Sequence, residues 1–215
     1  MAIVLFSGGL DSTVALWWAA QNYGGPQHAI SFFYGQRHAV ELQAARKILE
    51  AAPVKSHIFA SVNGIGLGLH GALVDHDAQL VATDPDGNAF LPGRNILFLT
   101  LAALRSAVIK DYTLIVGCNA DDAAGFPDCR YHAILAMQSA LTLGLGVPAQ
   151  VVAPFITDTK SRVISAARSL GSDCWAAIGK SWSCYEGGVM PCGACRACVV
   201  RAEAFRVAGE TDPAL

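Results

Sequence analysis

Six residues near the start of the chain, Ser7-Gly8-Gly9-Leu10-Asp11-Ser12, have the types and order needed to hold a phosphate chain. They follow the apolar run Ala2 to Leu5 and precede an apolar-rich segment, Val14 to Ala20, so the pattern predicts a strand, a glycine turn and a helix. Two adjacent glycines let backbone N–H groups approach an anion, and the N-terminus of the helix adds positive charge. A helix N-cap alone would need only one such polar residue. The sequence therefore predicts a phosphate-binding loop.

The side chains of this loop fall into two chemical groups. The hydroxyls of Ser7, Ser12 and Thr13 can donate hydrogen bonds to phosphate oxygens. The carboxylate of Asp11 tolerates a phosphate only with a cation between them, so we expect Asp11 to anchor Mg²⁺. Asp11 and Ser12 are predicted to be catalytic. The predicted nucleotide-binding segment comprises Phe6, Ser7, Gly8, Gly9, Leu10, Asp11, Ser12, Thr13, Val14, Ala15 and Leu16.

The loop also resembles a known one. Its sequence is similar to the pyrophosphate-binding loop of the PP-loop ATP pyrophosphatase superfamily, and it lacks the Gly-Lys-Ser/Thr ending of a Walker loop. Members of that superfamily split ATP between the α and β phosphates and transfer adenylate to an oxygen. The resemblance implies ATP as a cosubstrate.

Four cysteines near the end of the chain have the spacing of a metal site. Cys184, Cys192, Cys195 and Cys198 form a C-x7-C-x2-C-x2-C pattern, and four thiolates can close on one tetrahedral ion. We expect Zn²⁺, although an iron–sulfur cluster also takes four cysteines. Disulfides are disfavoured in a chain with no export signal. Because four protein ligands leave no coordination position open, the ion is expected to be structural.

Four further segments resemble one family. With the loop and the cysteines, they are similar to the 7-cyano-7-deazaguanine synthase family from residue 3 to about residue 206. The resemblance implies an ATP-dependent carbon–nitrogen ligase, a homodimer, that converts 7-carboxy-7-deazaguanine and ammonia to the nitrile in queuosine precursor biosynthesis. The segments are Tyr34-Gly35-Gln36-Arg37-His38 with Glu41-Leu42, Pro92-Gly93-Arg94-Asn95, Gly125-Phe126-Pro127-Asp128-Cys129-Arg130, and Trp182-Ser183-Cys184-Tyr185.

Several charged residues are candidates for catalysis or substrate binding at this site. Lys160 and Arg94 are predicted to neutralise charge on phosphorus, although a solvated Lys160 and a structural Arg94 remain open. Asp128 can accept from a guanine-like edge and Arg130 can pair with a carboxylate, or the two can pair with each other. Arg37 is also predicted to bind substrate, with a phosphate contact, a dimer contact or a helix-entry role as alternatives.

The chain departs from the family pattern at one position. An aspartate, an aromatic residue and a serine usually precede Gly125, whereas Asp122 is followed here by Ala123 and Ala124. If that aromatic residue stacks on the base, its loss favours a related enzyme that adenylates a deazaguanine acid and joins it to another amine, such as a protein. A tRNA sulfur-transferring PP-loop enzyme, which would need a basic surface, and a non-catalytic nucleotide-binding module are further alternatives.

The elements around these residues alternate between strand and helix patterns. Short β-branched and aromatic runs between helix-period segments predict an α/β fold, an open parallel sheet with helices on both faces, of the adenine-nucleotide alpha-hydrolase-like, Rossmann-like type. Glycines and prolines predict an irregular excursion or lid from Asn63 to Pro92, with a turn at Asp84-Pro85-Asp86-Gly87. The expected strands are Ile3 to Phe6, His28 to Phe33, Ser56 to Phe59, Thr113 to Val116 and Val151 to Ala153, and the expected helices are Thr13 to Gln21, Val40 to Glu50, Asn95 to Ile109, His132 to Leu143 and Ser161 to Leu170.

The composition of the chain limits the number of domains and the kinds of molecule that it is expected to bind. With 215 residues, 53% of them hydrophobic, the chain can bury one core, so we expect a single domain over residues 1–215 with a zinc-binding segment at about 184–198. A formal charge of −2 favours a small-molecule substrate over direct nucleic-acid binding. The longest apolar stretch, Ile96 to Leu104, is too short to span a membrane. The protein is expected to be soluble and cytoplasmic.

Overall fold

The computed structural model describes residues 1–63, 68, 71–75, 77 and 89–215. In that part of the chain, five strands form one parallel sheet in the order β3-β2-β1-β4-β5, which confirms the predicted open parallel sheet. The strands are β1 (Ile3–Leu5), β2 (Gln27–Phe33), β3 (Val54–Ser61), β4 (Thr113–Ile115) and β5 (Gln150–Val152).

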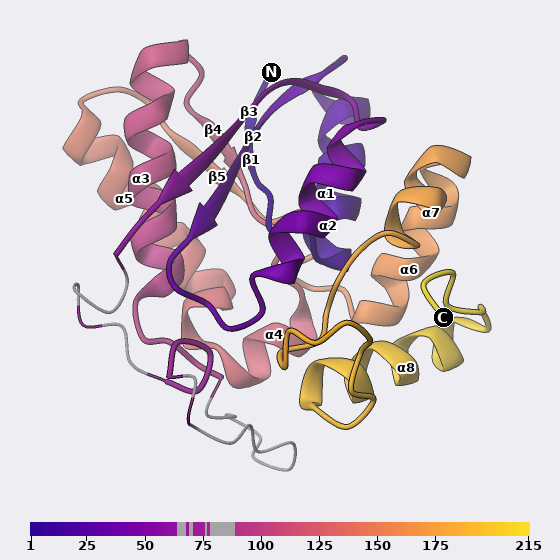
Figure 1. Cartoon of the computed structure of the whole chain (residues 1–215). Coiled ribbons are helices and arrows are strands. Elements are labelled where there is room, and N and C mark those ends of the chain that lie inside the picture. Colours follow the sequence, from indigo (N-terminus) through magenta and orange to yellow (C-terminus); the bar gives the residue numbers. More distant parts are fainter. Residues whose placement is uncertain (64–67, 69–70, 76, 78–88) are drawn as a thin grey trace.

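Helices cover both faces of the sheet. On one side lie α3 and α5, and on the other lie α1, α2 and α6 to α8 (Figure 1). The helices are α1 (Leu10–Asn22), α2 (Val40–Leu49), α3 (Arg94–Ile109), α4 (Ala120–Gly125), α5 (Tyr131–Leu145), α6 (Lys160–Ser169), α7 (Ser172–Ile178) and α8 (Arg196–Ala208), with a 3₁₀ turn η1 at Pro127–Cys129.

The two layers of core follow from the alternation of side chains along a strand. Successive residues of β1 point to opposite faces, so Ile3 joins the cluster under α3 and α5 while Val4 joins the cluster under α1, α6, α7 and α8. Both residues are at most 1% exposed. Strands covered on both faces are rich in apolar side chains, which is why short apolar runs predicted the strands at the centre of the sheet. The edge strand β3 has no fully buried residue and is less uniformly apolar.

Three helices were not anticipated from the sequence. The first is α4, whose Asn119 forms a capping box with Asp122 and could have been found from that Asn-x-x-Asp signal. The second, α7, is only 7 residues long. The third, α8, buries Cys198 and Arg201 together with Ala204 and Phe205, so its inward face does not have an apolar pattern.

The order of the strands places a crevice at the carboxyl end of the sheet. From β1 the chain moves outward to β2 and β3, and it then returns to the other side of β1 to form β4. Loops that leave β1 and β4 therefore diverge, and such a switch point is where ligands bind in open α/β sheets. The loop Ser7 to Ser12 leaves β1 at this point.

Other expectations meet the structure only in part. Most of the segment predicted as a lid, including the turn at Asp84 to Gly87, lies outside the described residues. The domain division and the homodimer stay predictions.

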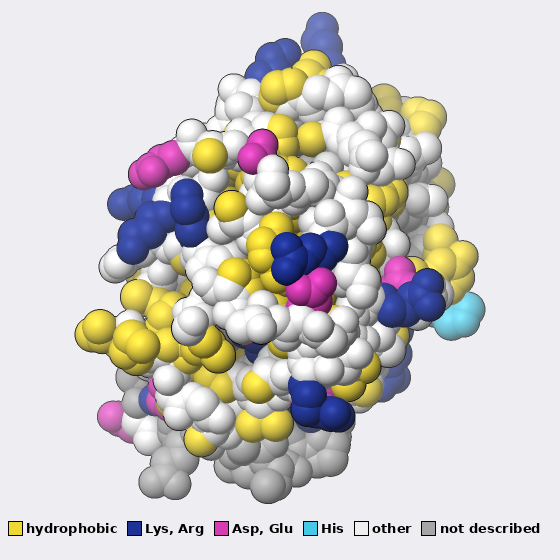
Figure 2. Space-filling model, turned by 90° about the vertical axis from the view of Figure 1, so that its right-hand side faces the viewer, with side chains coloured by type: hydrophobic (Ala, Val, Ile, Leu, Met, Phe, Trp, Pro, Cys, Tyr) yellow, Lys and Arg dark blue, Asp and Glu magenta, His cyan; other side chains and the backbone are white. Residues whose placement is uncertain are grey.

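Across the described chain, none of the helices is both long and apolar enough to cross a membrane. On the face that carries α6 to α8, Lys and Arg side chains lie in separate small groups, several of them beside Asp or Glu (Figure 2).

Candidate active site

A cavity of about 260 Å³ opens at the carboxyl ends of β1, β2 and β4. One side of it is the loop Ser7 to Ser12, and the aromatic rings of Phe98, Phe126 and Tyr185 contribute other parts of its wall. Ionisable side chains line it from five further elements or loops, namely His38, Glu41, Arg94, Asp122 and Lys160. The cavity thus combines a polar side with aromatic surfaces.

The conformation of the loop is stabilised by hydrogen bonds among its own atoms. The Ser7 Oγ atom lies 3.1 Å from Ser12 Oγ and accepts from Gly9 N at 3.1 Å. Thr13 Oγ1 and Ser12 Oγ both donate to Gly9 O, at 2.8 and 3.1 Å. Since Ser12 and Thr13 belong to the first turn of α1, these contacts fix the loop to the N-terminus of the helix, where an anion is stabilised.

Two glycines are required by close backbone approach. A Cβ atom on Gly8, whose φ is +94°, would lie 2.4 Å from Glu41 O in α2. A Cβ atom on Gly117, which follows β4, would lie 2.8 Å from Asp11 C and Ser12 N. The phosphate-loop backbone is therefore enclosed between α2 and the end of β4 with no room for a side chain at either position.

Asp11 and Lys160 form an ion pair inside the cavity. Lys160 Nζ lies 3.0 Å from Asp11 Oδ2, and Asn119 Nδ2 donates to Asp11 Oδ1 at 3.0 Å. Burial lowers the pKa of Lys160, but the carboxylates of Asp11 and Asp122 raise it further, so the net pKa is raised. Lys160 therefore stays protonated, and its side chain is only 14% exposed, which excludes the solvated alternative.

Asp122 lies near this pair, and its carboxyl is a weaker acid than usual because its pKa is raised. Burial raises its pKa, Lys160 lowers it and Asp11 raises it, with a resulting pKa of about 6. Its Oδ2 atom accepts from Asn119 N at 3.3 Å, so the same Asn119 orients both carboxylates. Asp122 can therefore gain or lose a proton near neutral pH.

We expect the variant Asp122→Asn to be more stable than the parent protein at pH 8, and by only about half as much at pH 5. The native pKa of about 6 exceeds the unfolded value of about 3.9, so the native state keeps a proton that the unfolded state has lost between these values. The contribution of Asp122 to stability then falls as the pH rises through about 6. At about 1.4 kcal/mol per unit, the gain at pH 8 is up to about 3 kcal/mol.

Thermal unfolding of both proteins at pH 5 and pH 8 measures this difference. Asp173→Asn, at an exposed position of α7, is the matched control and should show no such dependence on pH. A stability difference that is the same at both pH values would contradict the assignment of Asp122.

Arg94 begins α3 and faces the cavity from the opposite layer. Its Nη1 atom lies 3.3 Å from Tyr34 OH, and burial raises the pKa of that tyrosine. The backbone N–H of Asn95 donates to Asp128 Oδ2 at 3.2 Å, and Asn95 Nδ2 donates to Cys129 Sγ. Arg94 therefore points into the cavity, and Asn95 connects α3 to η1 through its hydrogen bonds.

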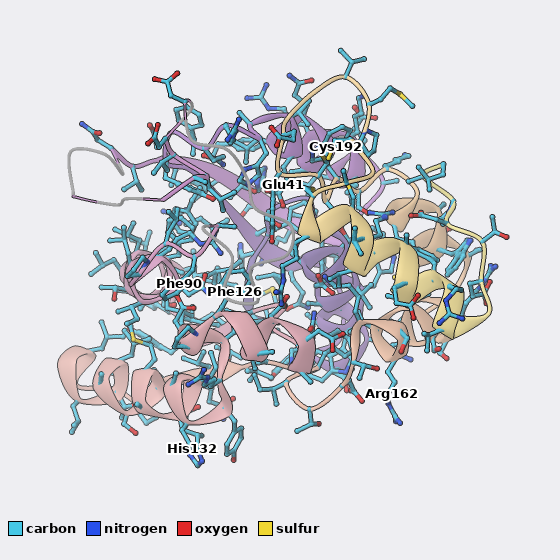
Figure 3. The ribbon with its side chains drawn as sticks, turned by 90° about the horizontal axis from the view of Figure 1, so that it is seen from below. Glu41, Phe90, Phe126, His132, Arg162 and Cys192 are labelled. Carbon is cyan, nitrogen blue, oxygen red and sulfur yellow. The ribbon has the colours of Figure 1, made fainter. Side chains whose placement is uncertain are left out.

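The three residues predicted to contact substrate lie outside the described lining of the cavity. Arg37 pairs with Glu186 at 3.2 Å, Asp128 accepts from the start of α3, and the exposed Arg130 donates to Ala123 O at 3.2 Å. Their contacts with substrate stay predictions. The ring centroids of Phe90 and Phe126 lie 6.0 Å apart, and Phe126 lines the cavity. Figure 3 labels the two side chains next to each other.

The four predicted metal ligands come together. One ligand atom from each of Cys184, Cys192, Cys195 and Cys198 lies within 4.8 Å of all the others, so the group could hold a metal ion. Burial raises the pKa of the Cys192 thiol, but backbone N–H groups of Cys195 and Ala194 lower it more, to about 7. A thiol that ionises near neutral pH is ready to bind a metal.

The cysteine segment also contributes to the cavity. Trp182 N donates to Gly8 O at 3.0 Å, which joins the segment directly to the phosphate loop. A Cβ atom on Gly187, whose φ is +67°, would lie 2.4 Å from Arg37 O. Because Trp182, Ser183 and Tyr185 line the cavity, the cysteine cluster supports one of its walls.

Sequence reasoning missed three contributors to this site. They are Gly117, Asn119 and Tyr34. Asn119 follows β4 at the sheet edge where ligands gather, and this position was a usable signal. Gly117 carried no signal, because the need for it arises only from the approach of α1.

Comparisons with known proteins show the family of the chain. The family described as "Queuosine biosynthesis protein QueC" matches residues 1–209. Curated relatives called 7-cyano-7-deazaguanine synthase include one from Laribacter hongkongensis, 39% identical over 100% of this chain and 93% of its own length. Another, from Chromobacterium violaceum, is 37% identical over 99% of this chain and 92% of its own. A third, from Trichodesmium erythraeum, is 39% identical over 99% of this chain and 98% of its own length.

Among solved structures, the chain is similar to the U34-tRNA thiolase NcsA from Methanococcus maripaludis with its 4Fe-4S cluster. The sequence identity is 16%, over 96% of this chain and 63% of that chain, and the TM-score is 0.49.

Proposed function

The chain belongs to the QueC family of queuosine biosynthesis proteins, and from this we propose that it is an ATP-dependent ligase that makes 7-cyano-7-deazaguanine from 7-carboxy-7-deazaguanine and ammonia. The observation that carries the proposal is the partly buried Lys160–Asp11 ion pair beside the loop Ser7 to Ser12, in a cavity that also has aromatic walls. One end of the cavity suits phosphates and the other suits a flat, apolar-faced base.

The first chemical step activates the acid. A carboxylate is a poor electrophile, so one of its oxygens attacks the α phosphorus of ATP, the bond from that phosphorus to the β-phosphate oxygen breaks, and pyrophosphate leaves. Backbone N–H groups and the hydroxyls of Ser7 and Ser12 hold the pyrophosphate. Lys160 stabilises the negative charge that develops on the phosphoryl oxygens, and Arg94 provides a second positive charge from α3.

The later steps convert the acyl adenylate to the nitrile. Ammonia displaces AMP to give the amide, and a second adenylation, now at the amide oxygen, turns that oxygen into a leaving group. Loss of AMP and of the nitrogen-bound protons gives the nitrile. The same loop performs both adenylations, so the protein acts chiefly by positioning its reactants.

The residues present fit Mg²⁺ and Zn²⁺. Asp11 supplies hard carboxylate oxygens, each with a lone pair beyond those that accept from Lys160 and Asn119, and would hold Mg²⁺ against the phosphates. Bound there, the ion would offset the repulsion between carboxylate and phosphate. Four thiolates on Zn²⁺, at about 2.3 Å from the ion, lie about 3.8 Å apart, which matches the cysteine cluster. That ion would hold the cavity wall in place.

We expect the purified protein to contain about one zinc per chain and to be colourless. The stoichiometry follows from one cluster of four ligands, and the lack of colour follows from the filled d shell of Zn²⁺. Cys195→Ala should lose the metal and lower the thermal midpoint, because metal-binding free energy contributes to folding. Elemental analysis, visible absorption and thermal unfolding measure these properties.

Cys174→Ala is the matched control for this experiment. Cys174 is fully buried in the core under α7, away from the cluster, so this variant loses packing but should retain the zinc. Broad visible absorbance that disappears with Cys195 would instead assign an iron–sulfur cluster.

The amide intermediate provides the test of the proposed function. Given the amide, ATP and Mg²⁺ without ammonium, the protein should release AMP, pyrophosphate and the nitrile, which mass spectrometry identifies. With ATP limiting and ammonium present, the acid should accumulate as amide. An inert amide, with continued activation of the acid, would favour enzymes that join the acid to another amine, the alternative raised by Ala123-Ala124. Phe126, which lines the cavity, supplies an aromatic surface near those alanines.

A further inference from the structure

One buried nitrogen in the cavity wall lacks a partner. His38 is 5% exposed and lines the cavity, and within the described residues its Nδ1 atom is buried without a hydrogen-bond partner. Leaving a buried polar atom unpaired costs about 1–3 kcal/mol. Such an exception to hydrogen-bond pairing is expected where a ligand completes the site.

The other imidazole nitrogen is fixed by a carboxylate. His38 Nε2 lies 3.3 Å from Glu41 Oε2, one turn further along the chain in α2. A carboxylate accepts a hydrogen bond, so the neutral imidazole carries its proton on Nε2 and keeps a lone pair on Nδ1. In many enzymes a carboxylate orients a histidine through one ring nitrogen. The other ring nitrogen then takes a proton from the nucleophile and so activates it.

The pair lies beside the phosphate loop. A Cβ atom built on Gly9 would lie 3.0 Å from Glu41 Oε1, so this carboxylate borders the loop. Figure 3 shows Glu41 near the centre of the molecule, next to the loop that carries Cys192. The ring of Tyr185 lies 6.0 Å from that of His38, at an interplanar angle of 56°. The pair His38–Glu41 therefore lies between the phosphate loop and an aromatic part of the cavity wall.

The turn into α2 does not explain the side chain of His38. That turn is made by the backbone, since Glu41 N donates to His38 O at 2.9 Å. The imidazole bridges the same turn through the contact of Nε2 with Glu41, and its Nδ1 atom takes no part in it. Its pairing with Glu41 and its position in the cavity wall point to a role in the reaction.

We propose that His38 and Glu41 form the ammonium subsite of the ligase, in which His38 Nδ1 takes a proton from ammonium to release ammonia next to the acyl adenylate. The inference rests on the proposed function and adds the group that supplies the nucleophile. Ammonium, like the ammonium group of lysine, is protonated at neutral pH and has no lone pair with which to attack. Glu41, which acts through His38, is a positioning residue.

The step balances as follows in protons and electron pairs. One N–H bond of ammonium breaks, its proton goes to His38 Nδ1, and its electron pair stays on nitrogen. That pair forms the C–N bond at the carboxyl carbon. The bond from this carbon to the adenylate oxygen breaks, and its electron pair leaves with AMP. A second nitrogen proton passes to the departing phosphate or to water, which leaves the amide.

Three reactions of His38→Gln separate this role from a structural one. The Gln side chain places an amide near the position of Nε2 and so can still donate to Glu41, but it has no basic nitrogen. The first reaction is exchange of pyrophosphate into ATP that depends on the acid, without an amine. The second is amide formation from ammonium. The third is hydroxamate formation from hydroxylamine, which is uncharged at neutral pH and needs no base to free its lone pair.

For His38→Gln we expect exchange and hydroxamate formation within about threefold of the parent protein, and amide formation from ammonium lowered about 100-fold or more. Glu41→Gln should show the same pattern with a smaller loss. His132→Gln, at the exposed position labelled in Figure 3, is the matched control and should leave all three reactions unchanged.

Three results with His38→Gln would overturn the subsite. They are equal losses of the ammonium and hydroxylamine reactions, a loss of pyrophosphate exchange, and amide formation from ammonium at the parent rate. If His38→Gln does not fold, His38→Asn, which also has no basic nitrogen but does not reach Glu41, is assayed in the same three reactions. Failure of the proposed function has a different signature, because the parent protein would then show no acid-dependent exchange.

Discussion

Lys160→Met is expected to lower the rate of pyrophosphate release about 100- to 1,000-fold in a protein that still folds. The Nζ atom of Lys160 lies 3.0 Å from Asp11 Oδ2 in the cavity, and its raised pKa keeps it charged at every pH at which the protein would be assayed. Removing that charge takes away the side-chain cation that is proposed to stabilise the phosphoryl oxygens in the transition state. Methionine keeps most of the side-chain volume, so the packing of α6 should change little.

Steady-state pyrophosphate release and thermal unfolding, measured together, test this expectation. Lys180→Met, at an exposed position before Trp182, is the matched control and should retain the activity. Asp11→Asn should also remove turnover, and the double variant should lose little more than either single one, because the two side chains act as a unit. Normal turnover in Lys160→Met would limit the ion pair to a structural role.

Gly8→Ala is expected to abolish turnover and to lower the free energy of unfolding by about 2–6 kcal/mol. Two costs add at this position. The φ of +94° is unfavourable for a residue with a Cβ atom, and that atom would lie 2.4 Å from Glu41 O and 2.6 Å from Ala45 N. Neither neighbour is a flexible side chain, so α2 must move away from the loop.

Gly24→Ala separates the two costs. Its φ is +69°, but a Cβ atom there would meet nothing within 4 Å, so only the backbone term remains, about 1 kcal/mol. Denaturant unfolding of both variants, with pyrophosphate release as the second readout, measures the difference. Equal destabilisation of the two variants would show that the approach of α2 to Gly8 does not matter.

Local patterns predicted those parts of the fold and site in which the partners are close in sequence. Each strand was found from its own apolar run, and the cysteines were found from their spacing, because a turn of a few residues brings Cys192, Cys195 and Cys198 together. The glycines of the loop similarly indicated an anion site. The missed helix α8 shows the limit of this reasoning, since a buried Arg201 paired with Asp212 gives no apolar signal.

The sequence by itself determined the chemical types present: a phosphate loop that needs Gly8 and Gly9, a four-thiolate metal site, and an alternation of strands and helices that permits only a parallel sheet with covered faces. Tertiary structure alone decided which groups act together. Asp11 meets Asn119 and Lys160 because β1, β4 and the segment after β5 end at the same edge of the sheet. Trp182 meets Gly8 across an even longer separation. Such contacts depend on strand order, which no local pattern encodes.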